Sequence, residues 1–304
     1  MNDQTRNVRL AYAAAISAYF IYGLSFIFTR IAMDHTTASI LLAVRFTVSL
    51  AAMGLLVLFC VAKLDLRGKP LGRFLLMGLC QPVIYYFGET AGVQYTNASF
   101  SGIMIAVIPV VTALLSTLLL KEDLPLGKFL WIVVSVFGVT LISITQSSNG
   151  VIQPKGILFL LIAVFSASFF SILSKSIAGS FTSFERTFVM MVMGFVVFLG
   201  NAVIQEGADF LPLYTGAFRN PSVILPILYL SLISSVVAFF CQNYSMSYLP
   251  VTQATIFTNI APIVSVAAGV LVLSEPFSAI HIVAMILSLF GVYKVTSYKP
   301  DAQV

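Results

Sequence analysis

The chain has 304 residues, of which 59% are hydrophobic and only 9% are charged. A water-soluble domain carries about 25% charged residues, so this chain could not cover its own surface with polar groups. The net charge of +5 does not indicate a nucleic-acid-binding protein, because the basic residues are dispersed and lie mainly between apolar runs. The composition therefore excludes a soluble protein and predicts one whose solvent is the lipid bilayer.

Apolar runs bounded by turn residues or charges predict ten membrane-spanning helices, since one crossing needs about 20 apolar residues. In chain order they cover residues 10–32, 39–62, 72–95, 97–120, 126–145, 156–178, 183–204, 222–248, 251–273 and 278–297. The first run is too long for the apolar region of a signal peptide, so we expect it to be retained. The sequence thus predicts an all-α polytopic membrane protein without a separate soluble domain.

The basic residues predict the orientation of the chain in the cell membrane, because cytoplasmic loops are enriched in lysine and arginine. With a cytoplasmic N-terminus, twelve of the 16 lysines and arginines fall on the cytoplasmic side and the remaining four on the opposite side. We therefore expect both termini to be cytoplasmic.

An internal repeat is the strongest sign of organisation in the sequence. A shift of 153 residues, without a gap, matches Tyr95 with Tyr248, Pro109 with Pro262, Glu122 with Glu275 and Ser135–Val139 with Ser288–Val292. Residues 1–150 and 151–304 then hold five predicted helices each, and because five is odd the second half crosses the membrane in the opposite sense. The alternative is a chance similarity among apolar helices, but so long a register without a gap is improbable by chance. Inverted repeats are typical of secondary transporters, whose site lies near the midplane between the halves.

Pro109 and Pro262 lie near the middle of the fourth and ninth predicted helices. A proline there removes one backbone hydrogen bond and kinks the helix, and the freed carbonyl must face protein or water rather than lipid. The residues around Pro109 are small, which favours close helix packing. Thr255 and Asn259 near Pro262 are polar and favour the lining of a cavity.

Glu89 is the carboxylate placed well inside an apolar segment, and an ionisable group in lipid is a functional candidate by default. Arg45 lies at a matching depth on the second predicted helix, which predicts a structural ion pair between Arg45 and Glu89. The alternative is that Glu89 contacts a substrate amine or carries a coupling proton. The repeat equivalent of Glu89 is the neutral Gln242, so a role that needs charge belongs to one half only.

Aromatic side chains follow one face of the first predicted helix, with Tyr19 and Tyr22 too deep to be interfacial anchors. Because phenol oxygens require water or a partner, we expect these rings to line a pocket or, alternatively, a packed helix interface. Tyr85 and Phe239 add further aromatic side chains at membrane depth.

Several classes of function are not indicated by any motif. The chain has no lysine or arginine between Arg219 and Lys294, whereas a phosphorylated substrate needs buried basic partners. There is no phosphate-binding loop for ATP, no catalytic Ser/His/Asp set, no paired carboxylates and no metal-ligand spacing. We therefore expect neither an enzyme nor a cofactor or metal site.

Short motifs follow one another along the chain in a fixed order. They are Tyr22-Gly23-Leu24-Ser25-Phe26 with Arg30, Arg45-Phe46, Glu89-Thr90 with Tyr95-Thr96-Asn97-Ala98, Leu120-Lys121-Glu122 with Gly138-Val139, and Leu273-Ser274-Glu275 with Gly291-Val292. Together they resemble the EamA-type members of the drug/metabolite transporter superfamily, although Tyr22 replaces a tryptophan and Lys121 and Ser274 replace glycines. The resemblance covers nearly the whole chain. It implies a ten-helix basket of two inverted repeats that exports or exchanges amino acids or other metabolites.

The sequence therefore predicts a carrier of small unphosphorylated metabolites that works by alternating access, with protons as a candidate coupling ion. A passive channel for small solutes is the alternative. The substrate-binding candidates face the predicted space between the halves and are Tyr19, Tyr22, Tyr85, Glu89, Phe239, Gln242, Thr255 and Asn259.

Overall fold

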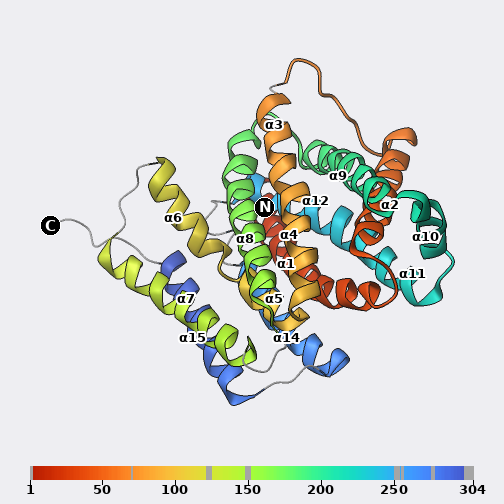
Figure 1. The fold of residues 1–304 in the computed structure, drawn as a ribbon. Coiled ribbons are helices and arrows are strands. Elements are labelled where there is room, and N and C mark those ends of the chain that lie inside the picture. The colour runs from red at the N-terminus through yellow and green to blue at the C-terminus, as the bar shows by residue number, and fades with distance from the viewer. Residues whose placement is uncertain are drawn as a thin grey trace.

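The computed structural model describes residues 3–69, 71–120, 125–147, 152–249, 254, 257–274 and 278–297. Within these ranges every regular element is a helix (Figure 1). In the first half the elements are α1 (Asp3–Met33), α2 (Ala38–Leu58), α3 (Leu71–Gly78), the π-helical η1 (Leu79–Ile84), α4 (Tyr85–Tyr95), α5 (Ala98–Ile105), α6 (Ile108–Leu120) and α7 (Leu126–Ser147). In the second half they are α8 (Pro154–Ile177), α9 (Ser183–Glu206), η2 (Gly207–Asp209), α10 (Phe210–Ala217), α11 (Pro221–Leu228), the π-helical η3 (Tyr229–Ala238), α12 (Phe239–Tyr248), η4 (Phe257–Asn259), α14 (Ile260–Leu273) and α15 (Ala279–Ser297).

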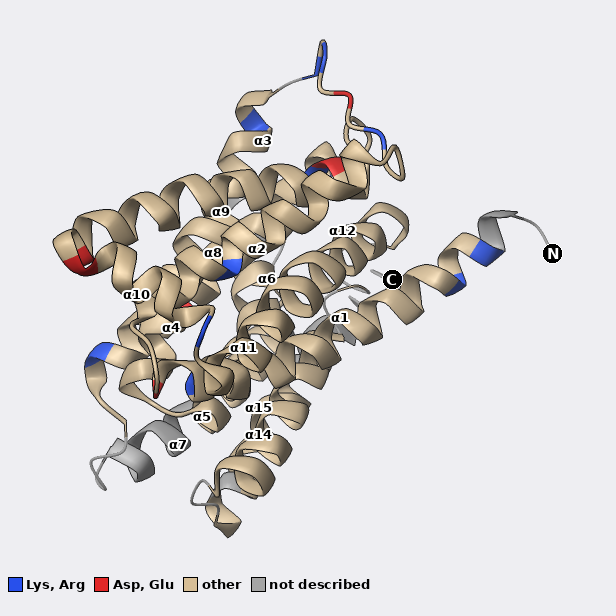
Figure 2. Ribbon diagram, turned by 90° about the vertical axis from the view of Figure 1, so that its right-hand side faces the viewer, with Lys and Arg blue, Asp and Glu red and all other residues tan. Residues whose placement is uncertain are grey.

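The helices have the length and composition of membrane spans. Six helical segments within the described ranges are long and apolar enough to cross a bilayer, and three shorter apolar helices accompany them. Most of the charged residues lie near the ends of the helices or in the connections, and few lie within the bundle (Figure 2). The chain is therefore a polytopic membrane protein.

One helix departs from the prediction. Residues 205–221 were expected to be a connection, yet they contain η2 and α10. Sequence patterns missed α10 because it has only 8 residues and contains Pro212. Its position depends on tertiary contacts, since the Tyr214 hydroxyl donates to Thr47 Oγ1 at 2.8 Å and Ala217 is buried in the cluster of apolar side chains against α2.

Three of the helical runs are interrupted at mid-length. Before Pro109, α5 ends at Ile105, and the amides of Ala106 and Val107 bond three residues back instead of four, at 3.1 Å each. Before Pro262, the 3₁₀ turn η4 precedes α14. The third interruption is at Gln81, whose extended backbone (φ −139°, ψ 117°) precedes Pro82, as expected for a residue that precedes proline.

The core is built from helices of the first half packed against helices of the second. The pairs are α2 with α9, α4 with α8, α1 with α12 and α14, α5 with α14, and α7 with α15. The α7–α15 pair lies to one side of the bundle (Figure 1). Its crossing is close because a Cβ on Gly138 would lie 2.6 Å from the Ala284 carbonyl oxygen, and one on Gly291 would lie 2.7 Å from the Ser135 nitrogen.

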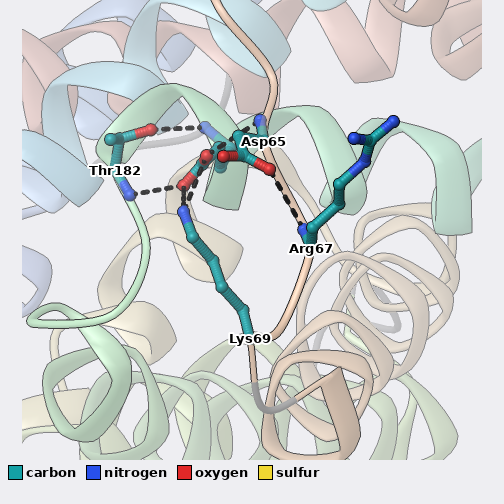
Figure 3. Close-up of polar contacts among 5 residues, drawn as sticks. Asp65, Arg67, Lys69 and Thr182 are labelled. Carbon is teal, nitrogen blue, oxygen red and sulfur yellow. Dashed lines mark hydrogen bonds and ion pairs between the residues drawn. The ribbon is translucent and has the colours of Figure 1, made fainter.

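Both ends of the α2–α9 pair are tied by polar contacts. At one end the Glu185 carboxylate accepts from Lys69 Nζ at 2.7 and 2.8 Å and from the Asp65 amide at 3.2 Å (Figure 3). Glu185 also forms a capping box with Thr182 at the start of α9. At the opposite end, Glu206 accepts hydrogen bonds from the hydroxyls of Thr37 and Ser39 at the start of α2.

Candidate functional site

A cavity lies at the centre of the bundle, where the interrupted helices meet α1 and α8. Its lining residues come from both halves of the chain and are Tyr19, Tyr22, Phe26, Gln81, Tyr85, Ile105, Ile108, Ala167, Ser171, Gln242, Thr258 and Ala261. Ile105 and Ile108 flank the break before Pro109, and Thr258 and Ala261 flank the break before Pro262. A proline lacks an N–H and cannot donate to the backbone carbonyl four residues before it. Pro109 therefore leaves the Ile105 carbonyl without its helical donor, and Pro262 leaves that of Thr258.

The cavity is small in this conformation. Its volume is about 30 Å³, enough for a few water molecules but well below the ~300–1,000 Å³ of ordinary ligand pockets. A solute the size of an amino acid requires the lining helices to move apart.

Aromatic rings form one wall of the cavity. Tyr19 and Tyr22 meet edge to face with their ring centroids 6.0 Å apart, and Phe239 packs edge to face on Tyr22 at 5.7 Å. Tyr85 meets Tyr86 in the same manner at 5.1 Å. These contacts fix the planes of the rings, because edge-to-face arrangements are the favoured geometry of aromatic pairs.

Polar side chains complete the lining. The Tyr22 hydroxyl donates to Gln242 Oε1 at 2.9 Å, which joins α1 to α12 across the cavity. Gln81 is 4% exposed and Thr258 is 1% exposed. Among the described residues, Gln81 Oε1 has no hydrogen-bond partner, whereas the Thr258 hydroxyl lies beside that of Tyr19. Buried polar atoms are almost always paired, so Gln81 Oε1 is a candidate contact for a ligand.

The structure brings together half of the predicted substrate-binding residues. Tyr19, Tyr22, Tyr85 and Gln242 line the cavity. Phe239 lies behind Tyr22 and also packs on Tyr86 at 6.2 Å.

Glu89 and Asn259 are not among the lining residues. Asn259 ends η4, and its buried Oδ1 has no partner among the described residues. Thr255 falls outside the described residues. Gln81, Ser171 and Thr258 were missed, although the proline after Gln81 was a sequence signal for a break at that position.

The predicted ion pair between Arg45 and Glu89 is not formed in this structure. The Arg45 guanidinium instead donates from Nε to Ser235 Oγ at 2.8 Å, and from Nη2 to the Tyr86 hydroxyl at 2.7 Å and to Ser234 Oγ at 3.0 Å. Glu89 is 2% exposed, and its carboxylate accepts from the Thr90 hydroxyl at 3.5 Å. Equal depth in two helices does not fix the direction of their side chains around the helix axes, which explains the error.

Comparison with known proteins identifies the family. The model of the EamA-like transporter family matches residues 9–144 and again residues 154–297. The uncharacterized transporter YcxC of Bacillus subtilis is 32% identical over 93% of this chain and 91% of its own length. The uncharacterized inner membrane transporter YedA of Escherichia coli K12 is 24% identical over 94% of this chain and 90% of its own. A solved crystal structure shares the fold, with a TM-score of 0.68 and 16% identity over 94% of this chain and 96% of the other. The resemblance seen in the sequence is confirmed, and the chain is a membrane transporter that belongs to the EamA-like transporter family.

Proposed function

We propose that this transporter carries small unphosphorylated metabolites, amino acids first among them, by alternating access between two inverted five-helix halves, residues 1–150 and 151–304. The observation that carries the proposal is the central cavity, which is lined from both halves and bounded by the helix interruptions. Interrupted helices at the interface of two repeats are the usual setting of a transporter site.

The lining itself supports the inverted repeat. Under the shift of 153 residues, Ile105 corresponds to Thr258 and Ile108 to Ala261, and all four residues line the cavity. Nearer the N-terminus, where loop lengths differ between the halves, a shift of 145 residues matches Arg30 with Lys175. Under this shift Tyr22 and Phe26 correspond to the lining residues Ala167 and Ser171. A cavity built from equivalent positions is expected where two repeats meet about a pseudo-two-fold axis.

The helix contacts support the same relation. The third span of the first half, through α4, packs on the first span of the second half, α8. In return the third span of the second half, through α12, packs on α1. The α7–α15 crossing shows the same symmetry, because Ser135 meets Gly291, the repeat equivalent of Gly138, and Gly138 meets Ser288, the repeat equivalent of Ser135. The family model that matches each half separately is further support.

The size and charge of the cavity favour the proposed carrier over the alternatives. A volume of only about 30 Å³ favours a carrier whose helices must move apart to admit a solute over a permanently open channel. The described lining residues include no lysine, arginine or histidine, whereas a phosphate group would require buried cations. Glu89 is a buried carboxylate near this site without an ion-pair partner among the described residues, and we propose it as the group through which protons couple to transport.

Counterflow in proteoliposomes tests the proposal. Vesicles are preloaded with one unlabelled amino acid, and the uptake of the same labelled amino acid is followed for each of the twenty in turn. A carrier gives a transient overshoot of label inside for at least one of them. Ala167→Phe fills the cavity and abolishes the overshoot, whereas Ile162→Phe on the outer face of the same helix retains it. Equilibration without overshoot indicates a channel, and no movement of any amino acid contradicts the proposed substrate class.

A further inference from the structure

We infer that the central cavity recognises its substrate through a positively charged ammonium group, so that small amines and quaternary ammonium cations are bound more tightly than neutral or carboxylate-bearing analogues. This inference rests on the proposed function, and within its class of small unphosphorylated metabolites it ranks amines without a carboxylate above amino acids. It is carried by three properties of the cavity: its aromatic wall, its unpaired acceptors and its charge.

The aromatic wall offers ring surfaces to a cation. Tyr19, Tyr22, Phe26 and Tyr85 line the space, and the edge-to-face contact of Tyr22 with Tyr19 and Phe239 holds its ring in place. The face of an aromatic ring carries negative potential, and several rings around one site form a cage that attracts ammonium groups. The attraction is strongest where water is excluded. Tyr19, Phe26 and Tyr85 are buried, and Tyr22 is half-buried.

One side-chain acceptor of the lining lacks a donor. Gln81 Oε1 is buried and has no hydrogen-bond partner among the described residues. Pro109 and Pro262 also leave the carbonyls of Ile105 and Thr258 without their helical amide. A protonated amine brings up to three N–H donors to such a site, and a quaternary ammonium group brings polarised C–H groups.

The charge near the cavity also favours a cation. The lining residues that the structure describes include no basic side chain. Glu89 lies one helical turn beyond Tyr85 on α4 and therefore on the same face. Arg45 is close as well, but its guanidinium is engaged by Tyr86, Ser234 and Ser235. A ligand carboxylate finds no charged partner in this lining.

Three probes of similar size separate the effect of the positive charge from the effect of a carboxylate. Choline carries a trimethylammonium group, 3,3-dimethylbutan-1-ol replaces its nitrogen by a neutral carbon, and glycine betaine adds a carboxylate. Each is titrated against the detergent-purified full chain, and the rise in melting temperature gives the dissociation constant, since a ligand stabilises the state that it binds. We expect choline to bind at least tenfold more tightly than the alcohol and more tightly than betaine. Equal binding of choline and the alcohol, or tighter binding of betaine, overturns the inference.

Variants assign the effect to the cavity. Tyr85→Phe keeps a ring and retains choline affinity within about twofold, whereas Tyr85→Leu weakens it roughly 2- to 30-fold, the range for loss of one cation–π contact. Glu89→Gln weakens choline but not the alcohol. Phe165→Leu on the lipid-facing side of α8 leaves all three affinities unchanged. The melting temperature of each variant without ligand shows whether it is folded, and unchanged choline binding in both Tyr85→Leu and Glu89→Gln contradicts the assignment.

Counterflow separates this inference from the proposed function. If amino acids show overshoot while choline neither binds nor moves, the carrier function stands and ammonium recognition is wrong. If choline binds with the expected preference but no solute shows overshoot, the recognition stands and the carrier function fails.

Discussion

Arg45 joins three helical segments through a single side chain. It lies on α2 and is 1% exposed, while its guanidinium bonds with Tyr86 on α4 and with Ser234 and Ser235 on η3. The guanidinium carbon also lies 4.2 Å from the centre of the Tyr86 ring. A planar group that donates in several directions at once is needed here, and lysine has a different geometry.

Replacing Arg45 by lysine therefore destabilises the protein although the charge is kept. Loss of even one hydrogen bond to a charged group costs about 1.5–3 kcal/mol, so Arg45→Lys lowers the melting temperature by several degrees. Arg73→Lys at an exposed position of α3 serves as the control and leaves it unchanged. An Arg45→Lys protein as stable as the parent shows that the guanidinium contacts do not matter.

The residues that line the cavity were predictable where helical periodicity alone places a side chain on one face. They were not predictable where contacts between distant segments set its position. Tyr19 and Tyr22 were found because positions three apart share a helix face, and both line the cavity. The pairing of Arg45 with Glu89 was predicted from depth alone, and the structure gives Arg45 hydroxyl partners instead. Thr258 was missed because its exposure to the cavity depends on the turn η4, which periodicity does not encode.

At the scale of the elements, small residues set the distance between α2 and α9. A Cβ on Gly194 would lie 2.2 Å from the Phe46 ring, which also stacks on Phe198 with centroids 5.0 Å apart. Gly200 on the same helix has open space around its Cβ position. The two glycines thus form a matched pair for testing the contact.

Gly194→Ala forces Phe46 or the whole helix to shift, and overpacking of this kind typically costs about 1–3 kcal/mol. We expect a clear fall in the melting temperature of the detergent-purified protein. Gly200→Ala, which meets nothing, is neutral or slightly stabilising because alanine is the better helix former. The same effect of both substitutions contradicts the close crossing of α2 and α9.

Glu185 at the start of α9 binds the connection between α2 and α3, and its side chain is 3% exposed. Glu185→Gln removes the ion pair with Lys69 and weakens the acceptor of the Asp65 amide. We expect the connection to loosen, so that trypsin cleaves after the exposed Arg67 more rapidly. Glu206→Gln, at the other end of α9, leaves the rate unchanged. If Glu185→Gln does not accelerate cleavage, the ion pair does not hold this segment.

At the scale of the whole molecule, the bilayer explains why the helical spans were predictable. Every backbone polar group in lipid must be paired within its own segment, so each apolar run of sufficient length becomes a helix, as α2 (Ala38–Leu58) and α8 (Pro154–Ile177) illustrate. How the helices meet depends on contacts between distant segments, such as the close approach of Gly23 to the Ala261 carbonyl oxygen. Such contacts leave no trace in a single hydropathy pattern.

The central claim is that the cavity opens alternately to the two sides of the membrane, and Ser171 gives the most direct test. Ser171 is 4% exposed and lines the cavity. Cys60, Cys80 and Cys241 are replaced by serine, and Ser171→Cys is introduced as the single thiol. This last change alters the shape of the side chain little. A membrane-impermeant thiol reagent is applied to right-side-out and to inside-out vesicles, with Ser176→Cys, near the end of α8, as a control that reacts from one side only. The account predicts that position 171 reacts from both sides. Reaction from neither side, or from one side alone, contradicts it.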